Sequence, residues 1–188
     1  IAGAGVQWLR DRMKFFKKAT ETEKIIKSLK DNSDVYLVPA FTGLGAPYWD
    51  SNSRGVLSGL TRDTGPKEII RATIESVAYQ TYDLFEAMKH DGLRPRLVKV
   101  DGGMVTNNWF SQFLSDVVNV GVLRPKVQET TALGAAFMAG LQIGVYKSLK
   151  DISKNWSLDK KFSPKMKNNS RLKLIKGWSK AIKRTLIN

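Results

Sequence analysis

The segment VKVDGGMVTNN, residues 98–108, predicts a strand, a tight turn and the start of a helix. Gly102 and Gly103 follow the strand directly, and because they have no Cβ they let a flat group approach the backbone. The predicted helix offers free N–H groups and the positive end of its dipole. Ligands of open α/β sheets bind at this carboxyl end of the strands. The spacing matches neither a Walker loop nor G-x-G-x-x-G, so we expect no phosphate cradle here, and a plain turn is the alternative interpretation.

Outward from this segment, helices and strands alternate along the chain. The hydrophobic pattern predicts strands at residues 35–38, 56–60, 97–100 and 120–123, a turn at 31–34, and helices at 4–30 (with a second, charged helix from residue 21), 67–90, 107–118, 131–141 and 171–187. Such alternation is typical of βαβ units and predicts an α/β fold. The small residues of the 131–141 helix, among them Gly134 and Ala135, predict close packing against a neighbour.

A long segment, PAFTGLGAPYWDSNSRG at residues 39–55, separates the first two predicted strands. Loops of this length inside a compact domain are usually either functional or disordered. The aromatic residues Phe41, Tyr48 and Trp49 favour an ordered loop. Gly43 and Gly45 resemble half of a dinucleotide-binding fingerprint, but prolines flank them and no helix follows, so that interpretation fails.

Composition excludes several classes of site. The 188 residues contain no cysteine, which excludes disulfide frameworks, thiolate metal sites and cysteine nucleophiles. The single histidine, His90, lies at the end of the 67–90 helix, where a cation near the last carbonyls is favourable. The aspartates show no paired spacing that predicts a metal site. No apolar run reaches the roughly 20 residues that cross a bilayer, so the sequence predicts a cytoplasmic protein without membrane contact.

Positive charge is concentrated at the C-terminal end. Residues 147–188 hold thirteen Lys and Arg against two Asp, so they carry +11 of the net charge of +14. Trp156, Phe162 and Trp178 lie among these cations, a pattern that also occurs in nucleic-acid-binding surfaces. However, residues 171–187 place Ile175, Trp178, Ile182 and Leu186 on one helical face and most of the lysines off it. We therefore favour a docked helix with a solvated, lysine-rich face.

Five motifs stand in one order along the chain: VPAFTGLGAPYWD (residues 38–50), RGVLSGLTRDT (54–64), IIRATIESVAYQT (69–81), VDGGMVTNNWF (100–110) and TALGAAFMAGL (131–141). Together they resemble the C-terminal domain of the FGGY carbohydrate kinase family. The C-terminal signature of that family fits at Gly55, Leu57, Gly59, Leu60, Glu68, Ile69, Ala72, Thr73, Ile74 and Glu75. The GLGAPYWD loop resembles members that phosphorylate glycerol more than it resembles xylulose, gluconate or rhamnulose kinases.

The resemblance implies an actin-like ATPase (ribonuclease H-like) fold, here a C-terminal FGGY domain that lacks its first strands. It implies ATP-dependent phosphorylation of glycerol to sn-glycerol 3-phosphate, with ATP or ADP and Mg²⁺ as ligands and a homo-oligomer at full length. By their position in the adenosine motif of the family, Gly103, Met104 and Asn107 would line the nucleotide, and Gly3 and Gln7 would contact it from the first helix. The family has alanine where this chain has Met104.

The same resemblance places no catalytic residue and no magnesium ligand in this chain, because those groups come from the preceding part of the family's polypeptide. We therefore expect the chain, which opens at Ile1, to be a fragment that is inactive alone. Its expected parts are a domain at residues 1–146 and a basic helical extension of that domain at 147–188. The missing strands would leave a sheet edge and an apolar interface exposed, which favours aggregation. The alternatives are another FGGY sugar kinase and a non-catalytic, basic nucleic-acid-binding remnant.

Overall fold

The computed structural model describes residues 2–29 and 34–186. Ile1 and most of the turn predicted at 31–34 lie outside these residues. The elements follow one another as α1 (Ala2–Asp11), α2 (Glu21–Lys27), β1 (Tyr36–Val38), β2 (Val56–Ser58), α3 (Pro66–His90), β3 (Leu97–Lys99), a 3₁₀ helix η1 (Gly103–Thr106), α4 (Asn108–Val118), β4 (Gly121–Pro125), α5 (Thr130–Gln142), α6 (Leu149–Ser153), β5 (Leu158–Phe162) and α7 (Asn168–Thr185). This order confirms the predicted mixture of helices and strands.

The described strands form two small sheets. β1 and β2 pair antiparallel, while β3 pairs parallel with β4, and β4 pairs antiparallel with β5. In the second sheet Val98, Val122 and Phe162 stand in register. Strand β5 was not predicted, because its first four residues are exposed and two of them are lysines, so it lacks an apolar pattern. Within the described residues, β4 is the one partner of β3, which leaves the other edge of β3 free.

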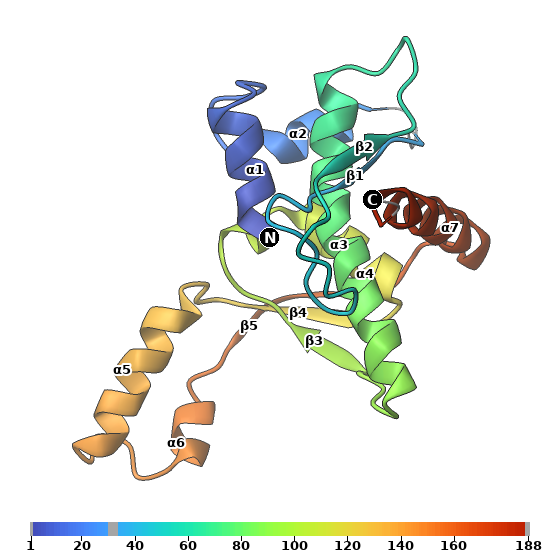
Figure 1. Ribbon diagram of the computed structural model, residues 1–188. Helices are drawn as coiled ribbons and strands as arrows, with labels where there is room; N and C mark the ends of the chain where they lie inside the picture. The colour runs from blue at the N-terminus through green and yellow to red at the C-terminus, as the bar shows by residue number, and fades with distance from the viewer. Residues whose placement is uncertain (1, 30–33, 187–188) are drawn as a thin grey trace.

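Helix α3 runs through the centre of the molecule (Figure 1). It packs against α4, β1, α1 and α2, and its buried residues include Ile70, Ile74 and Tyr79. The apolar periodicity of residues 67–90 therefore predicted the central helix correctly. Helix α7 packs against β1, β2 and α4, so the C-terminal helix closes the core from another side.

The loop at residues 39–55 is ordered, as its aromatic content predicted. A bridge joins Leu44 to Asp50, and the Asp50 carboxylate accepts hydrogen bonds from the backbone N–H groups of Asn52 and Ser53. The Ser53 hydroxyl lies 3.3 Å from the carbonyl oxygen of Thr185 in α7. Trp49 does not anchor the loop, since 79% of its surface is exposed.

Helix α5 stands apart from the core together with α6 (Figure 1). Its only buried residue is Gly140, and no heavy atom lies within 4 Å of the place where a Cβ of Gly134 would stand. The prediction of close packing for residues 131–141 is therefore wrong at Gly134 but confirmed at Gly140, where a Cβ would stand 2.9 Å from the ring of Tyr146. The segment after the helix folds back on it, so that Phe137 and Tyr146 meet edge to face at 5.5 Å. Gly134 thus faces open space, whereas Gly140 faces the segment that follows the helix.

Candidate functional site

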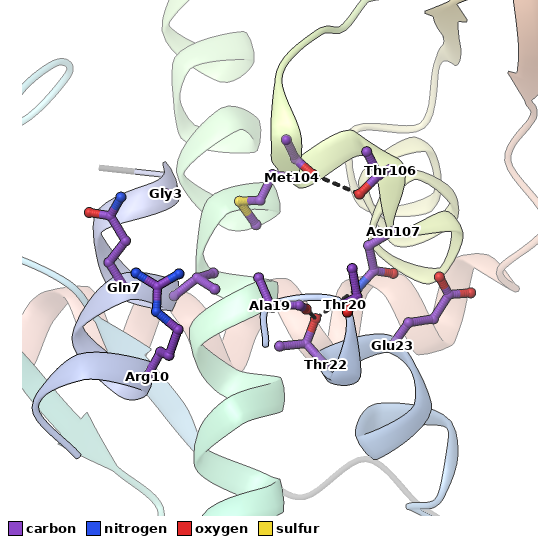
Figure 2. Close-up of a pocket in the computed structure, with 12 residues that line it drawn as sticks. Gly3, Gln7, Arg10, Ala19, Thr20, Thr22, Glu23, Met104, Thr106 and Asn107 are labelled. Carbon is purple, nitrogen blue, oxygen red and sulfur yellow. Dashed lines mark hydrogen bonds between the residues drawn. The ribbon is translucent and has the colours of Figure 1, made fainter. Parts of the chain in front are cut away.

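A pocket of about 530 Å³ opens between α1, the segment before and at the start of α2, and the glycine loop that leads into α4. Figure 2 shows how the residues from these three parts of the chain face one another. The lining residues are Gly3, Val6, Gln7, Arg10, Ala19, Thr20, Thr22, Glu23, Gly103, Met104, Thr106 and Asn107.

All five residues that the sequence analysis singled out line this pocket. Gly3 and Gln7 come from α1, whereas Gly103, Met104 and Asn107 come from a segment about a hundred residues later in the chain. The structure therefore brings together two groups of residues that only the family resemblance had connected. The contribution of residues 19–23 was not predicted, because periodicity predicts their helix but not the element on which it docks.

The glycine loop presents open backbone to the pocket. Gly102 has a φ of 84°, in the left-handed region that favours glycine, and its N–H donates to the carbonyl oxygen of Gln128 at 3.1 Å. No heavy atom lies within 4 Å of the Cβ position of Gly103. The Thr106 hydroxyl donates to the carbonyl oxygen of Gly103 at 2.7 Å, which closes the 3₁₀ turn. A flat ligand can therefore lie against this backbone.

Asn107 is held at the junction between this loop and α4. As the N-cap of α4, its Oδ1 accepts from the Phe110 N–H at 2.9 Å. Its Nδ2 lies 3.4 Å from the hydroxyl of Thr22, and that hydroxyl donates to the carbonyl oxygen of Ala19 at 2.7 Å. A side-chain amide carries two N–H donors, so these contacts leave one of them for a ligand in the pocket.

The N–H groups of Asn108 and Phe110 at the start of α4 already have acceptors, which corrects the expectation that they are free. The Asn108 N–H donates to Oε2 of Glu23 at 3.1 Å, and the Phe110 N–H donates to Oδ1 of Asn107 at 2.9 Å. A carboxylate at a helix N-terminus already compensates the positive end of the helix dipole. This end of the pocket therefore suits an uncharged group, such as a nucleotide base, better than a phosphate.

The charged side chains around the pocket are paired. Arg10 forms two contacts with Asp11, at 2.7 and 2.9 Å. The Lys27 ammonium lies 2.5 Å from Oε1 of Glu23. Burial raises the pKa of Glu23, but the hydrogen bonds from Lys27 and from the Asn108 N–H outweigh it and leave that pKa below its ordinary value. Glu23 is therefore ionised at neutral pH.

The described residues supply no magnesium site at this pocket. Glu23 provides the one carboxylate among the lining residues, and Lys27 and Asn108 already occupy its oxygens. No group of three or more acidic or histidine side chains in the described part of the chain could hold a metal ion.

Two of the three aromatic residues in the basic C-terminal segment belong to the core. Phe162 and Trp178 are 4% and 1% exposed, so neither can stack on a nucleic-acid base. The docked helix is confirmed, although its buried face differs from the predicted one: Leu174 and Ala181 are buried, while 37% of Leu186 is exposed. The lysines of α7 lie largely on its solvated side.

Residues 1–143 match the C-terminal domain of the FGGY family of carbohydrate kinases. The chain belongs to this family. Glycerol kinase 1 of Pseudomonas aeruginosa is 54% identical over 184 residues, which are 98% of this chain and 37% of the relative. A glycerol kinase of Clostridium botulinum is 52% identical over 187 residues, 99% of this chain and 38% of the relative. The chain thus spans little more than a third of the length of these FGGY relatives.

Solved structures agree with the FGGY fold. The crystal structure of Plasmodium falciparum glycerol kinase with ADP matches all of this chain and 37% of that chain, with a TM-score of 0.86 and 36% identity. A ligand-bound xylulose kinase from Lactobacillus acidophilus matches 97% of this chain and 37% of that chain, with a TM-score of 0.76 and 24% identity, which shows the fold alone. The actin-like ATPase fold of an FGGY C-terminal domain is therefore confirmed. Among the described residues, no helix is long and apolar enough to cross a membrane.

Proposed function

We propose that this chain supplies the adenosine-binding side of an ATP-dependent glycerol kinase. The observation that carries the proposal is the convergence of Gly3, Gln7, Gly103, Met104 and Asn107 on one pocket. The whole enzyme would transfer the γ-phosphoryl group of ATP to a terminal hydroxyl of glycerol and release sn-glycerol 3-phosphate and ADP.

Each part of the pocket has a role in this proposal. The open backbone at Gly103 receives the flat face of the purine, and Met104 borders it with an unbranched side chain that adapts to the ligand. The free N–H of Asn107 donates to an acceptor on the base. Gln7 faces the base from α1 on the other side of the pocket. The carboxylate of Glu23 at the start of α4 leaves the phosphates to be held elsewhere in the enzyme.

This chain contributes binding and orientation and no catalytic group. Phosphoryl transfer requires a base near the attacking hydroxyl, magnesium ligands and a phosphate clamp. In the proposed enzyme these groups lie in the part of the relatives that this chain does not cover. When bound there, Mg²⁺ would neutralise charge on the transferred phosphoryl group.

Glycerol is the proposed acceptor because the chain shares far more of its sequence with glycerol kinases than with the sugar kinase of known structure described above. Identity reaches 54% with a glycerol kinase, against 24% with a xylulose kinase structure.

We also propose that residues 147–188 extend the FGGY domain at residues 1–146. The pairing of β5 with β4 and the packing of α7 on β1 support that assignment.

Calorimetric titration of ADP into the 188-residue chain tests the adenosine site. Asn107→Ser keeps an N-cap hydroxyl for the Phe110 N–H but removes the amide donor. We expect this variant to lose affinity for ADP by about three- to tenfold, the range for one hydrogen bond, without a change in melting temperature. Asn155→Ala, an exposed asparagine in another part of the fold, is the control and should bind ADP as the wild type does.

Two results would contradict the proposal. One is a wild-type chain that does not bind ADP, and the other is an Asn107→Ser variant that binds it with unchanged affinity.

To test the acceptor, the longer enzyme that carries this sequence is assayed with ATP and glycerol, xylulose or gluconate in parallel. Faster phosphorylation of a sugar than of glycerol would favour another FGGY kinase.

A further inference from the structure

The short helix α2 forms one wall of the pocket. Four of the lining residues lie at positions 19–23, at and just before the start of this helix. α2 contacts α4 and α3, so it bridges the central helix and the helix that follows the glycine loop. Figure 2 shows Thr22 and Glu23 beside Asn107 and away from Gln7 and Arg10.

Thr22 fixes the orientation of the Asn107 amide. Thr22 is 3% exposed, and its hydroxyl hydrogen is used by the carbonyl oxygen of Ala19, so its oxygen faces Asn107 as an acceptor. A flipped Asn107 amide would place its oxygen against that acceptor and would leave the Phe110 N–H without its cap. The amide therefore has one orientation, with its nitrogen toward Thr22 and the pocket.

Glu23 fixes the first turn of α4, which carries that amide. Its Oε2 accepts from the Asn108 N–H at 3.1 Å, and its Oε1 pairs with Lys27 from the next turn of α2. The contact joins residues 85 positions apart in the sequence. A shift of α2 would move the start of α4 and, with it, Asn107.

We propose that Thr22 and Glu23 are positioning residues for the base of the bound nucleotide. They hold the Asn107 amide and the start of α4 in the geometry that receives an uncharged purine. Their main role is to keep the contacts between Asn107 and the base in place, and direct contact with the nucleotide is secondary. This inference rests on the proposed adenosine site and adds to it the segment that keeps the site in shape.

Affinities for both adenosine and ADP test the inference, because adenosine lacks phosphates. Glu23→Ala removes the acceptor for the Asn108 N–H, whereas Glu23→Gln keeps an acceptor there without the charge. We expect Glu23→Ala to lose about three- to tenfold in affinity for both ligands alike, and Glu23→Gln to recover most of that loss. Glu21→Gln, on the same helix but outside the pocket lining, is the matched control and should bind both ligands as the wild type does.

Thr22→Val is the second variant, since it nearly keeps the buried volume and removes the hydroxyl. We expect a similar loss for adenosine and ADP, with the melting temperature reported beside each affinity. If removing Glu23 strengthened ADP binding and left adenosine binding unchanged, charge repulsion of phosphate would explain the effect and the inference would be overturned. Wild-type affinities in both Glu23→Ala and Thr22→Val would also overturn it, while a wild-type chain that binds neither ligand would overturn the adenosine site itself.

Discussion

One carboxylate joins three distant parts of the chain. Asp83 of α3 accepts a hydrogen bond from Nε1 of Trp178 in α7 at 2.7 Å, and the hydroxyl of Tyr48 in the 39–55 loop also bonds to it. Burial raises the pKa of Asp83 above its ordinary value, and the bonds from Trp178 and Tyr48 offset only part of that rise. The Asp83 carboxylate thus links the loop and the terminal helix to α3, although its burial disfavours the ionised form.

The raised pKa predicts how stability depends on pH. Between the pKa of Asp83 in the unfolded chain and its higher pKa in the folded protein, the folded state binds more protons, so this residue makes stability fall as pH rises. Asp83→Asn keeps an acceptor for Trp178 and removes that slope. Asp83→Ala leaves the indole N–H buried without a partner and should cost about 1–3 kcal/mol. Thermal melts of both variants over about pH 4 to 7 check this; equal losses in the two variants would contradict it.

Helix α7 meets β1 where Gly177 faces Tyr36. A Cβ at Gly177 would overlap the phenol ring of Tyr36, which is 5% exposed and packs against Tyr79 at 5.8 Å. Alanine normally stabilises a helix interior by roughly 0.5–1 kcal/mol relative to glycine. Here the overlap should outweigh that gain, so we expect Gly177→Ala to destabilise the fold by about 1–3 kcal/mol.

Gly134→Ala in α5 is the matched control, because the same change meets open space there. Chemical denaturation of both variants should move their midpoints in opposite directions, or leave the control unchanged. A Gly177→Ala variant as stable as the wild type would show that α7 docks more loosely than the contact with Tyr36 implies.

The elements that the sequence predicted well are those whose signal is local. Helix α3 follows from apolar residues at 3.6-residue spacing, and α4 begins directly after its N-cap asparagine. The site residues on α1 and on the glycine loop came from the family resemblance, which connects positions that no local pattern links. By contrast, β5 has no apolar alternation, and the docking of Glu23 onto α4 depends on the tertiary fold. Neither could be obtained from the order of residues.

At the scale of the whole molecule, the described surface has an apolar region that the core does not use. Around α5 and the turn after it, Met138, Ile143, Val145 and Leu149 are 50–77% exposed, and the free edge of β3 carries Leu97 at 47%. An exposed apolar patch and an unpaired strand edge both favour association with another chain. The relatives have nearly two thirds of their length outside the region that this chain matches.

The net charge of +14 opposes that association, since two copies of the chain repel each other. Salt screens this repulsion, with a Debye length of about 10 Å at 0.1 M and about 3 Å at 1 M, but it does not weaken apolar contacts. We therefore expect the 188-residue chain to be monomeric at low ionic strength and to self-associate as salt is added. Static light scattering across a salt series at several protein concentrations measures this.

Substitutions identify which surface is responsible. Met138→Lys combined with Ile143→Lys should suppress association at high salt without lowering the melting temperature, because both side chains are at least half exposed. Leu172→Lys on α7, where 49% of the leucine is exposed, adds a like charge on another face and should suppress association much less. A wild-type chain that stays monomeric and melts cooperatively at high salt would show that the α5 surface and the β3 edge do not mediate self-association. In that case the electrostatic repulsion, even screened, exceeds what these apolar contacts contribute.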